Sequence, residues 1–217
     1  MLTLHGFSYS NYYNIPKHAL LYKGVEFAED LVYPSNEGYT HYNPVGKVPS
    51  LTLGDGQHLA EASVICEYIE EAYPEPALMP KDPYARGQVR QIMRYAELYL
   101  ELSSRRLLPY FFSKQTPPAE LADEVNAVLD RGVAGMNALC HIEPFLAGET
   151  FTMADIYIRY VLSVVDVAQA VLQRDVVGEI EGLGEWRARM DEDPVSQKVD
   201  ADKAANQADF FAYVASR

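Results

Sequence analysis

The spacing of hydrophobic residues changes near position 60, and the change predicts a pair of strands followed by a helix. Leu51 and Leu53 alternate with a threonine, which is the two-residue period of a strand with one buried face. A Gly-Asp-Gly tripeptide at residues 54–56 favours a tight turn, because Asp-Gly readily adopts the positive φ angles of a hairpin. We therefore expect residues 57–60 to return antiparallel to the first strand, and a helix to begin at Ser63.

The helix predicted over residues 63–73 has an apolar stripe and an acidic side. Its apolar positions recur at the spacing of one helix face, and they are Val64, Ile65, Tyr68, Ile69 and Ala72. The acidic side chains expected to face solvent are Glu67, Glu70 and Glu71. Such a helix packs its stripe against a sheet.

The first 42 residues predict a strand, a helix and a further strand. Leu2-Thr3-Leu4 is a short strand, and the helix that follows the next loop runs to about Lys23, with Gly24 as its stop. Pro16 lies in the second turn of this helix, where we expect it to kink or loosen the N-terminal end. Residues 25–32 predict the next strand.

Proline spacing divides the chain into two parts. Residues 73–83 contain four prolines without any periodic pattern, which is typical of a linker. Beyond this stretch the apolar positions follow helical spacing. The sequence therefore predicts an α/β domain over residues 1–78, a linker over residues 74–83 and an all-helical domain over residues 83–217.

A capping box marks one helix start in the second part. Thr152 is expected at the N-cap with Asp155 three residues later, and Phe151 is placed to contact Ile156 as a hydrophobic staple. We interpret this motif as structural rather than functional.

Composition excludes several classes of partner. The chain has 217 residues, 48% of them hydrophobic, and a formal net charge of −13, from 18 Lys and Arg against 31 Asp and Glu. This charge disfavours binding to nucleic acid and to anionic membrane surfaces. The N-terminal residues have no basic segment before a long apolar run, and Arg159 and Asp166 interrupt the apolar stretch at 156–172. We expect no signal peptide, no membrane span and a cytoplasmic location.

Cysteine and histidine spacing argues against disulfides and metals. Cys66 and Cys140 are too few for a disulfide framework, so we expect reduced, mostly buried thiols. The five histidines are scattered without a paired spacing, so no metal site is expected. The chain also has no phosphate-binding loop, no Gly-rich dinucleotide fingerprint and no Cys-x-x-Cys motif.

Residues 43–73 resemble the N-terminal domain of the soluble glutathione transferase superfamily. The signature of that superfamily is a basic residue before Val-Pro, followed by Glu-Ser at a helix start; here these are Lys47-Val48-Pro49 and Glu61-Ala62, with Ala62 in place of the serine. The resemblance is to serine-type members, tau- or theta-like or bacterial. It implies a thioredoxin-like domain followed by a helical bundle, a cis Pro49 and a homodimer.

The resemblance also implies where a thiol would be activated. Aligned on serine-type members, Ser10 occupies the position of the catalytic serine, with Tyr12, Asn11 and Ser8 as alternatives. Lowering a thiol pKa from about 8.5 to about 6.5 takes roughly 2.7 kcal/mol. A hydrogen bond to a charged acceptor supplies about 1.5 to 3 kcal/mol, so one hydroxyl suffices. The alternative for Ser10 is a helix N-cap with no catalytic part.

Two binding regions follow from the same resemblance. The residues implied for glutathione are Lys47, Val48, Pro49, Glu61, the backbone of Ala62 and, as an alternative, Ser63. An apolar pocket for the electrophile would be lined by aromatic residues, which could equally belong to the core: Tyr12, Tyr95, Tyr99 and Tyr110.

The function implied is conjugation of glutathione to small apolar electrophiles in detoxification, with glutathione as co-substrate and no metal. Two alternatives stay open. One is a non-catalytic binding or scaffold protein of the same fold, which Ala62 favours. The other is a glutathione-dependent isomerase or dehalogenase.

Overall fold

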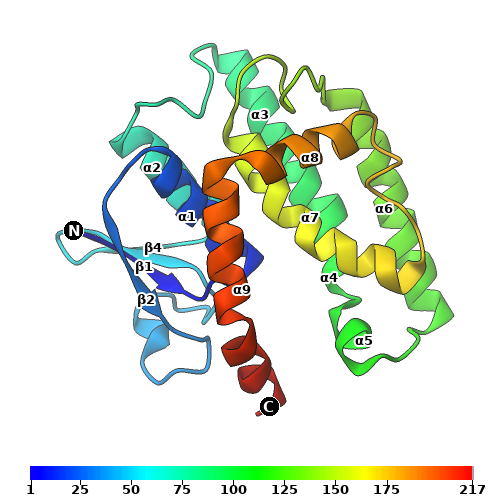
Figure 1. Ribbon diagram of the computed structural model, residues 1–217, viewed down its shortest axis with the longest axis horizontal. Helices are drawn as coiled ribbons and strands as arrows, with labels where there is room; N and C mark the ends of the chain where they lie inside the picture. Colours follow the sequence, from blue (N-terminus) through cyan, green and yellow to red (C-terminus); the bar gives the residue numbers. More distant parts are fainter. Residues whose placement is uncertain (217) are drawn as a thin grey trace. The chain divides into compact units, whose positions relative to one another are not determined.

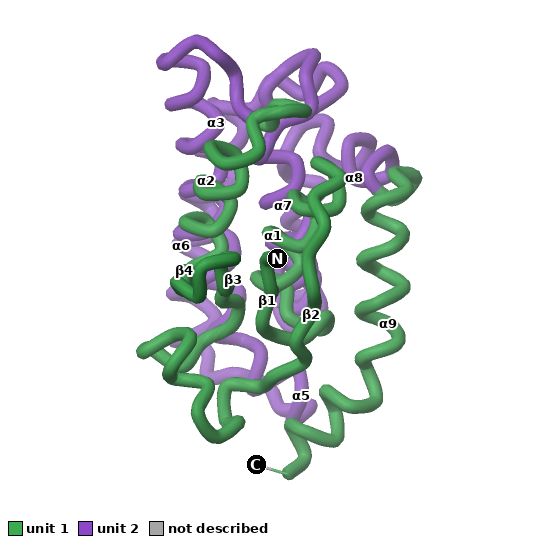
Figure 2. The backbone as a smooth tube through the Cα atoms, turned by 90° about the vertical axis from the view of Figure 1, so that its left-hand side faces the viewer, with its two compact units in different colours: residues 1–78, 191–217 green, residues 79–190 purple. Residues whose placement is uncertain are grey.

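The computed structural model describes residues 1–216, which form two compact units (Figures 1 and 2). Unit 1 contains residues 1–78 together with the C-terminal segment from residue 191, and unit 2 contains residues 79–190. None of the helices among these residues combines the length and the apolar composition that a membrane crossing requires.

The sheet of unit 1 has four strands in the order β2-β1-β3-β4. β1 (Leu2–Gly6) pairs parallel with β2 (Phe27–Leu31) on one side and antiparallel with β3 (Ser50–Thr52) on the other. β4 (His58–Ala60) completes the predicted hairpin with β3. The mixed sheet and its helices form a thioredoxin-like domain, which confirms the predicted fold of this part.

α1 (Asn11–Tyr22) and α2 (Ala62–Ala72) pack together in unit 1. α1 begins after Ser10, continues through Pro16 and ends before Gly24, whose φ of +63° suits the glycine stop that the sequence predicts. The core contains side chains from the sheet and both helices, all fully buried: Leu4, Ile15, Leu20, Leu51, Ile65 and Ile69.

The predicted stripe of α2 is wrong at three positions, and one of them is Ala72, which is exposed. Val64 is 46% exposed, whereas Glu70, expected in solvent, is 7% exposed. The buried face instead consists of Ala62, Ile65, Cys66, Ile69 and Glu70, a spacing of i, i+3, i+4, i+7 and i+8. The small apolar Cys66 replaces Val64 on this face, and Glu70 is buried because the ammonium group of Lys23 lies 2.7 Å from its carboxylate.

The C-terminal helix α9 (Pro194–Ala215) belongs to unit 1 and packs against α1 (Figure 1). The Lys17 ammonium group lies 2.8 Å from Asp202 of α9 and 2.6 Å from Glu29 of β2. Burial opposes ionisation of Asp202, but hydrogen bonds from Lys17 and Lys198 outweigh it and lower its pKa. These ion pairs therefore fix α9 to the first helix.

Unit 2 is helical and is built around α7 (Met153–Leu172), most of whose residues are buried. The other elements are α3 (Pro83–Tyr95), a π-helical turn η2 (Ala96–Glu101), α4 (Leu102–Arg105), α5 (Leu108–Ser113), α6 (Ala119–Leu139) and α8 (Leu183–Glu192), whose last two residues are assigned to unit 1. The capping box at Thr152 and Asp155 is present, as the sequence predicts. The helical architecture of this part is confirmed.

Candidate functional site

Strand register brings three loop ends to one edge of the unit 1 sheet. His5 in β1 pairs with Ser50 in β3, and Ser50 in turn pairs with Ala60 in β4. The chain therefore leaves β1 toward α1, enters β3 from Pro49 and leaves β4 toward α2 at the same edge. The predicted glutathione-binding residues and Ser10 all belong to these three connections.

Ser10 is the N-cap of α1. Its Oγ accepts a hydrogen bond from the Tyr13 N–H at 3.4 Å, and its own N–H donates to the Phe7 carbonyl at 3.0 Å. A hydroxyl has two lone pairs and one proton, so a cap that uses one lone pair leaves the proton available to a thiolate. The side chain is partly exposed. The two functions considered for Ser10 are therefore compatible.

The neighbours of Ser10 differ in how they are held. Ser8 is partly exposed and its carbonyl accepts from Asn14 Nδ2 at 2.9 Å, whereas Asn11 is buried and Tyr12 is partly buried. The Tyr13 hydroxyl donates to Glu29 Oε2 at 2.6 Å. Burial and this hydrogen bond raise the pKa of Tyr13, so its phenol stays protonated and occupied.

The turn before β3 is held by hydrogen bonds from two side chains that the sequence analysis does not identify as site residues. The peptide bond between Val48 and Pro49 is cis, as expected. The Lys47 carbonyl accepts from the Tyr39 hydroxyl at 2.8 Å and from Asn43 Nδ2 at 2.7 Å. Both donors are 2% exposed. Burial raises the pKa of Tyr39, which keeps its hydroxyl available as a donor.

The start of α2 combines backbone strain with amides that no side chain caps. Glu61 has φ +71° and ψ 122°, which a non-glycine residue adopts only at a cost of order 1–3 kcal/mol, and such strain clusters at functional sites. Its side chain makes no capping hydrogen bond and is exposed. The first-turn amides after it, from Ala62 and Ser63, are therefore suited to an anion.

Lys47 differs from the other two lysines in the first 78 residues. Lys17 and Lys23 are buried and paired with carboxylates. Lys47 is exposed beside the turn that leads to Pro49. It is thus the member of the three that is placed to meet a ligand carboxylate in solvent.

The four tyrosines expected to bind the electrophile belong to different units. Tyr12 is in α1 of unit 1, whereas Tyr95, Tyr99 and Tyr110 are in unit 2. The rings of Tyr95 and Tyr99 contact edge to face at 5.5 Å. A Cβ at Gly135 of α6 would lie 2.6 Å from the Tyr95 ring, so this ring packs directly on α6. Tyr95 is nevertheless partly exposed, and its hydroxyl accepts from Gln91 Nε2 at 3.3 Å.

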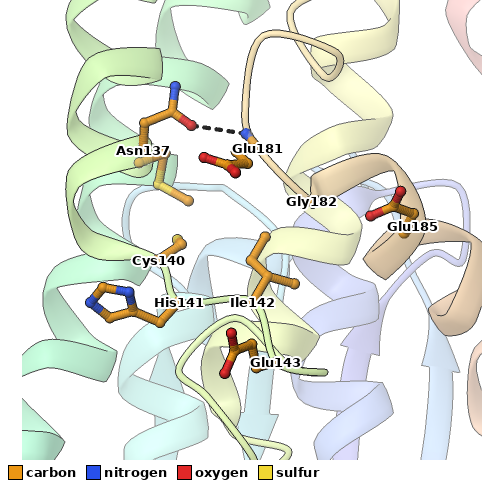
Figure 3. A pocket seen from close by; sticks show the side chains of 9 residues that line it. Asn137, Cys140, His141, Ile142, Glu143, Glu181, Gly182 and Glu185 are labelled. Atoms are coloured by element: carbon orange, nitrogen blue, oxygen red, sulfur yellow. Dashed lines mark hydrogen bonds between the residues drawn. The ribbon is translucent and has the colours of Figure 1, made fainter.

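A pocket of about 660 Å³ is formed within unit 2 and contains none of the predicted site residues (Figure 3). It lies between the end of α6, the following loop and the start of α8, and the Asn137 side chain accepts from the Glu181 N–H at 2.9 Å across it. Burial and Asp155 raise the pKa of the Cys140 thiol to about 12, so this lining cysteine is not a thiolate near neutral pH.

Comparisons with known proteins agree on one family. Residues 4–77 match the family described as glutathione S-transferase, N-terminal domain. The chain is 34% identical over its whole length to a glutathione S-transferase of Pseudomonas putida, 99% of which is covered. It is 27% identical over 138 residues to a maleylacetoacetate isomerase of Dictyostelium discoideum, a match that spans 62% of this chain and 63% of that protein. A glutathione S-transferase structure from Rhodospirillum rubrum is 25% identical, with a TM-score of 0.73 and coverage of 92% of this chain and 91% of that one.

The protein combines a thioredoxin-like domain, in which a cis-proline precedes β3, with a helical unit. These features define the class of thioredoxin-fold proteins that carry an additional helical domain. Because the likeness to the Pseudomonas protein extends over the full length, the chain belongs to the glutathione S-transferase family of enzymes.

Proposed function

We propose that this enzyme conjugates glutathione to small apolar electrophiles, with the thiolate stabilised by the hydroxyl of Ser10. The observation that carries the proposal is the position of Ser10 at the start of α1, where its Oγ takes one hydrogen bond from the Tyr13 amide and retains its proton. The helix N-terminus adds about 0.3 to 1 kcal/mol in favour of a negative charge. Together these two effects lower the thiol pKa.

The remaining contacts to glutathione follow from the same sheet edge. The backbone of Val48 would pair with the peptide as an added strand, a common way for proteins to bind peptides. Lys47 would meet a carboxylate, and Glu61 would accept the ammonium group. The amides of Ala62 and Ser63 would hold the γ-glutamyl carboxylate at the start of α2.

Ser10→Ala is expected to raise the pKa of the bound thiol by about one to two units and to lower turnover by roughly 10 to 100-fold, since one unit is about 1.36 kcal/mol. Glutathione affinity should change little. The pKa is measured from the ultraviolet absorbance of the thiolate against pH, and turnover with a chromogenic electrophile.

Two further variants separate catalysis from capping. Ser10→Asp keeps an acceptor for the Tyr13 amide but places a negative charge near the thiolate, so it should retain stability and lose turnover. Ser35→Ala, an exposed serine of the same unit, serves as the matched control. Unaltered turnover in Ser10→Ala would transfer the role to Tyr12 or Ser8.

Ala62→Ser is expected to tighten glutathione binding by roughly 10 to 100-fold, because a hydrogen bond to a charged group contributes about 1.5 to 3 kcal/mol. Alanine keeps the amide and the helix dipole but lacks the hydroxyl. Ser63→Ala should change the dissociation constant by less than about threefold, since Ser63 points about 100° around the helix. Calorimetry gives both constants. A strong loss in Ser63→Ala with no gain in Ala62→Ser would assign the carboxylate to Ser63.

A glutathione-dependent isomerase is the second candidate, favoured by the 27% identity to maleylacetoacetate isomerase over 138 residues. Isomerisation needs a thiolate that adds to the substrate and is released again, so it uses the same Ser10. Assays of cis–trans isomerisation and of conjugation, run on one preparation, distinguish the two. Binding of glutathione with neither activity would indicate a scaffold protein.

We further propose that the protein is a cytoplasmic homodimer that detoxifies electrophiles. Its two domains would be divided at the linker of residues 74–83. Tyr12 is the aromatic residue of the predicted electrophile pocket that lies two residues from Ser10. Light scattering of the purified chain measures the oligomeric state directly.

A further inference from the structure

Three histidines of unit 1 that are distant in sequence lie along one line of polar contacts across the sheet. Asp30 Oδ2 is 2.8 Å from His5 Nδ1, and His5 Nε2 is 2.6 Å from Thr52 Oγ1. The same Oγ1 is 2.9 Å from His58 Nδ1, and His58 Nε2 is 3.3 Å from His41 Nε2. The line thus begins at a carboxylate and ends at two imidazole nitrogens.

When His5 is neutral, the line of contacts assigns the proton of His58 to one ring nitrogen. A carboxylate can only accept, so Nδ1 of a neutral His5 donates to Asp30 and leaves Nε2 as an acceptor. The Thr52 hydroxyl has one proton, which it donates to His5 Nε2. Its lone pairs then accept from His58 Nδ1–H. With His5 neutral, the outer nitrogen of His58 therefore carries a lone pair that faces His41.

The two outer nitrogens are spaced as ligands of one metal ion. Zn–N bonds are about 2.0–2.1 Å, so two nitrogens on a tetrahedral ion lie about 3.3 Å apart. The observed separation of 3.3 Å matches this value. The ring centroids of His41 and His58 are 4.9 Å apart and the ring planes are inclined by 74°, so the two rings are not stacked face to face. His41 is exposed, which leaves room for water ligands.

We propose that His41 and His58 form a two-histidine site for Zn²⁺, Ni²⁺ or Cu²⁺, ions that favour imidazole nitrogen. Among residues 1–216 no group of three or more histidine, cysteine or acidic side chains is arranged to hold a metal, so water supplies the other ligands. Thr52 and His5 orient the His58 ring from behind, as hydrogen-bonded outer partners do for metal-bound histidines. The site does not depend on the proposed reaction.

The metal would join two segments next to the glutathione edge. His41 ends the short helix η1 (Tyr39–His41), and His58 begins β4. Tyr39 of η1 holds the Lys47 carbonyl through its hydroxyl. An ion bound at the two histidines would therefore steady the turn that leads to Pro49.

The test is calorimetric titration of the full chain with ZnCl₂ and CuCl₂, without glutathione. The wild-type protein is expected to bind one ion, and His41→Gln and His58→Gln should each weaken binding by more than about tenfold. Thr52→Val should weaken it by about tenfold, the size typical of lost outer hydrogen bonds. His141→Gln, an exposed histidine of unit 2, is the matched control and should bind as the wild type does.

Electron paramagnetic resonance of the Cu²⁺ form gives an independent readout. The wild-type spectrum should show two imidazole nitrogens, and the His41 and His58 variants one. Circular dichroism melts without metal show that each variant folds. Equal affinity in the wild type and both variants, a spectrum of oxygen ligands alone, or no binding at all would overturn the proposal, because the carboxylates of this acidic chain bind metal weakly without histidine.

Burial disfavours the two thiols as metal ligands in this experiment. Burial and Glu67 raise the pKa of Cys66, and burial and Asp155 raise that of Cys140 to about 12. Thiolate is the metal-binding form of cysteine, so both side chains are poor ligands near neutral pH.

Discussion

Replacing Asp155 by alanine is expected to lower the free energy of unfolding by about 4 kcal/mol or more, because it leaves several buried donors unpaired at about 1–3 kcal/mol each. Asp155 is fully buried. Its Oδ1 accepts from the Leu146 N–H at 2.9 Å and from Trp186 Nε1–H at 2.8 Å. Its Oδ2 accepts from the Thr152 N–H at 2.8 Å and from the Thr152 hydroxyl at 3.1 Å. One carboxylate therefore joins the start of α7, the loop before it and α8.

Denaturant unfolding followed by tryptophan fluorescence measures this loss. Trp186 is the single tryptophan of the chain, and its indole is bonded to Asp155, so the probe reports on this part of unit 2. Thr152→Ala is the matched control and should cost about 1 kcal/mol, the usual value of an N-cap. Glutathione affinity should be unchanged in Thr152→Ala. A loss near 1 kcal/mol for Asp155→Ala as well would mean that the capping box accounts for its whole contribution.

The contacts of Asp155 also show which interactions can be predicted from the sequence and which cannot. The spacing of Thr152 and Asp155 predicts the capping box, because every atom involved lies within one helical turn. The bond from Trp186 joins residues 31 positions apart, and no local spacing indicates it. Short local signals likewise predict correctly where a helix or strand ends. Examples are Gly24 after α1 and the Gly-Asp-Gly turn after β3, which act through backbone conformation alone.

In the candidate site too, some residues can be recognised from the local sequence, whereas others are brought together only by the fold. The Lys47-Val48-Pro49 turn is recognisable from its residues, whereas Tyr39 and Asn43, which hold the Lys47 carbonyl, are not. The two histidines of the proposed metal site are 17 residues apart and meet only when η1 lies beside β4. Helical periodicity also could not indicate that α9 packs with unit 1, because a helix with a weak apolar stripe gives no sign of its partner.

Glu70 is the clearest example of a residue that is buried because of its ion-pair partner. The sequence predicts this acidic side chain in solvent on α2, yet it is buried against Lys23 at the end of α1, with 2.7 Å between Glu70 Oε2 and Lys23 Nζ. Lys23 Nζ also donates to the carbonyls of Tyr73 at 2.8 Å and Pro76 at 2.7 Å. The Leu78 N–H donates to the Glu70 carboxylate at 3.1 Å. This buried pair therefore fixes the segment that leaves unit 1.

Lys23→Met is expected to lower the free energy of unfolding by about 3–5 kcal/mol, because removing one partner leaves an uncompensated buried carboxylate. Adding Glu70→Leu removes that charge, so the double variant should lose less than the sum of the two single losses, with a coupling of about 0.5–3 kcal/mol. Lys47→Met, an exposed lysine of the same unit, should change stability by less than about 0.5 kcal/mol. Thermal and denaturant unfolding of the wild type, the two single variants, the double variant and the Lys47→Met control gives the values. Additive single losses would show that Lys23 acts through the Tyr73 and Pro76 carbonyls rather than through Glu70, since those bonds are lost in the double variant as well.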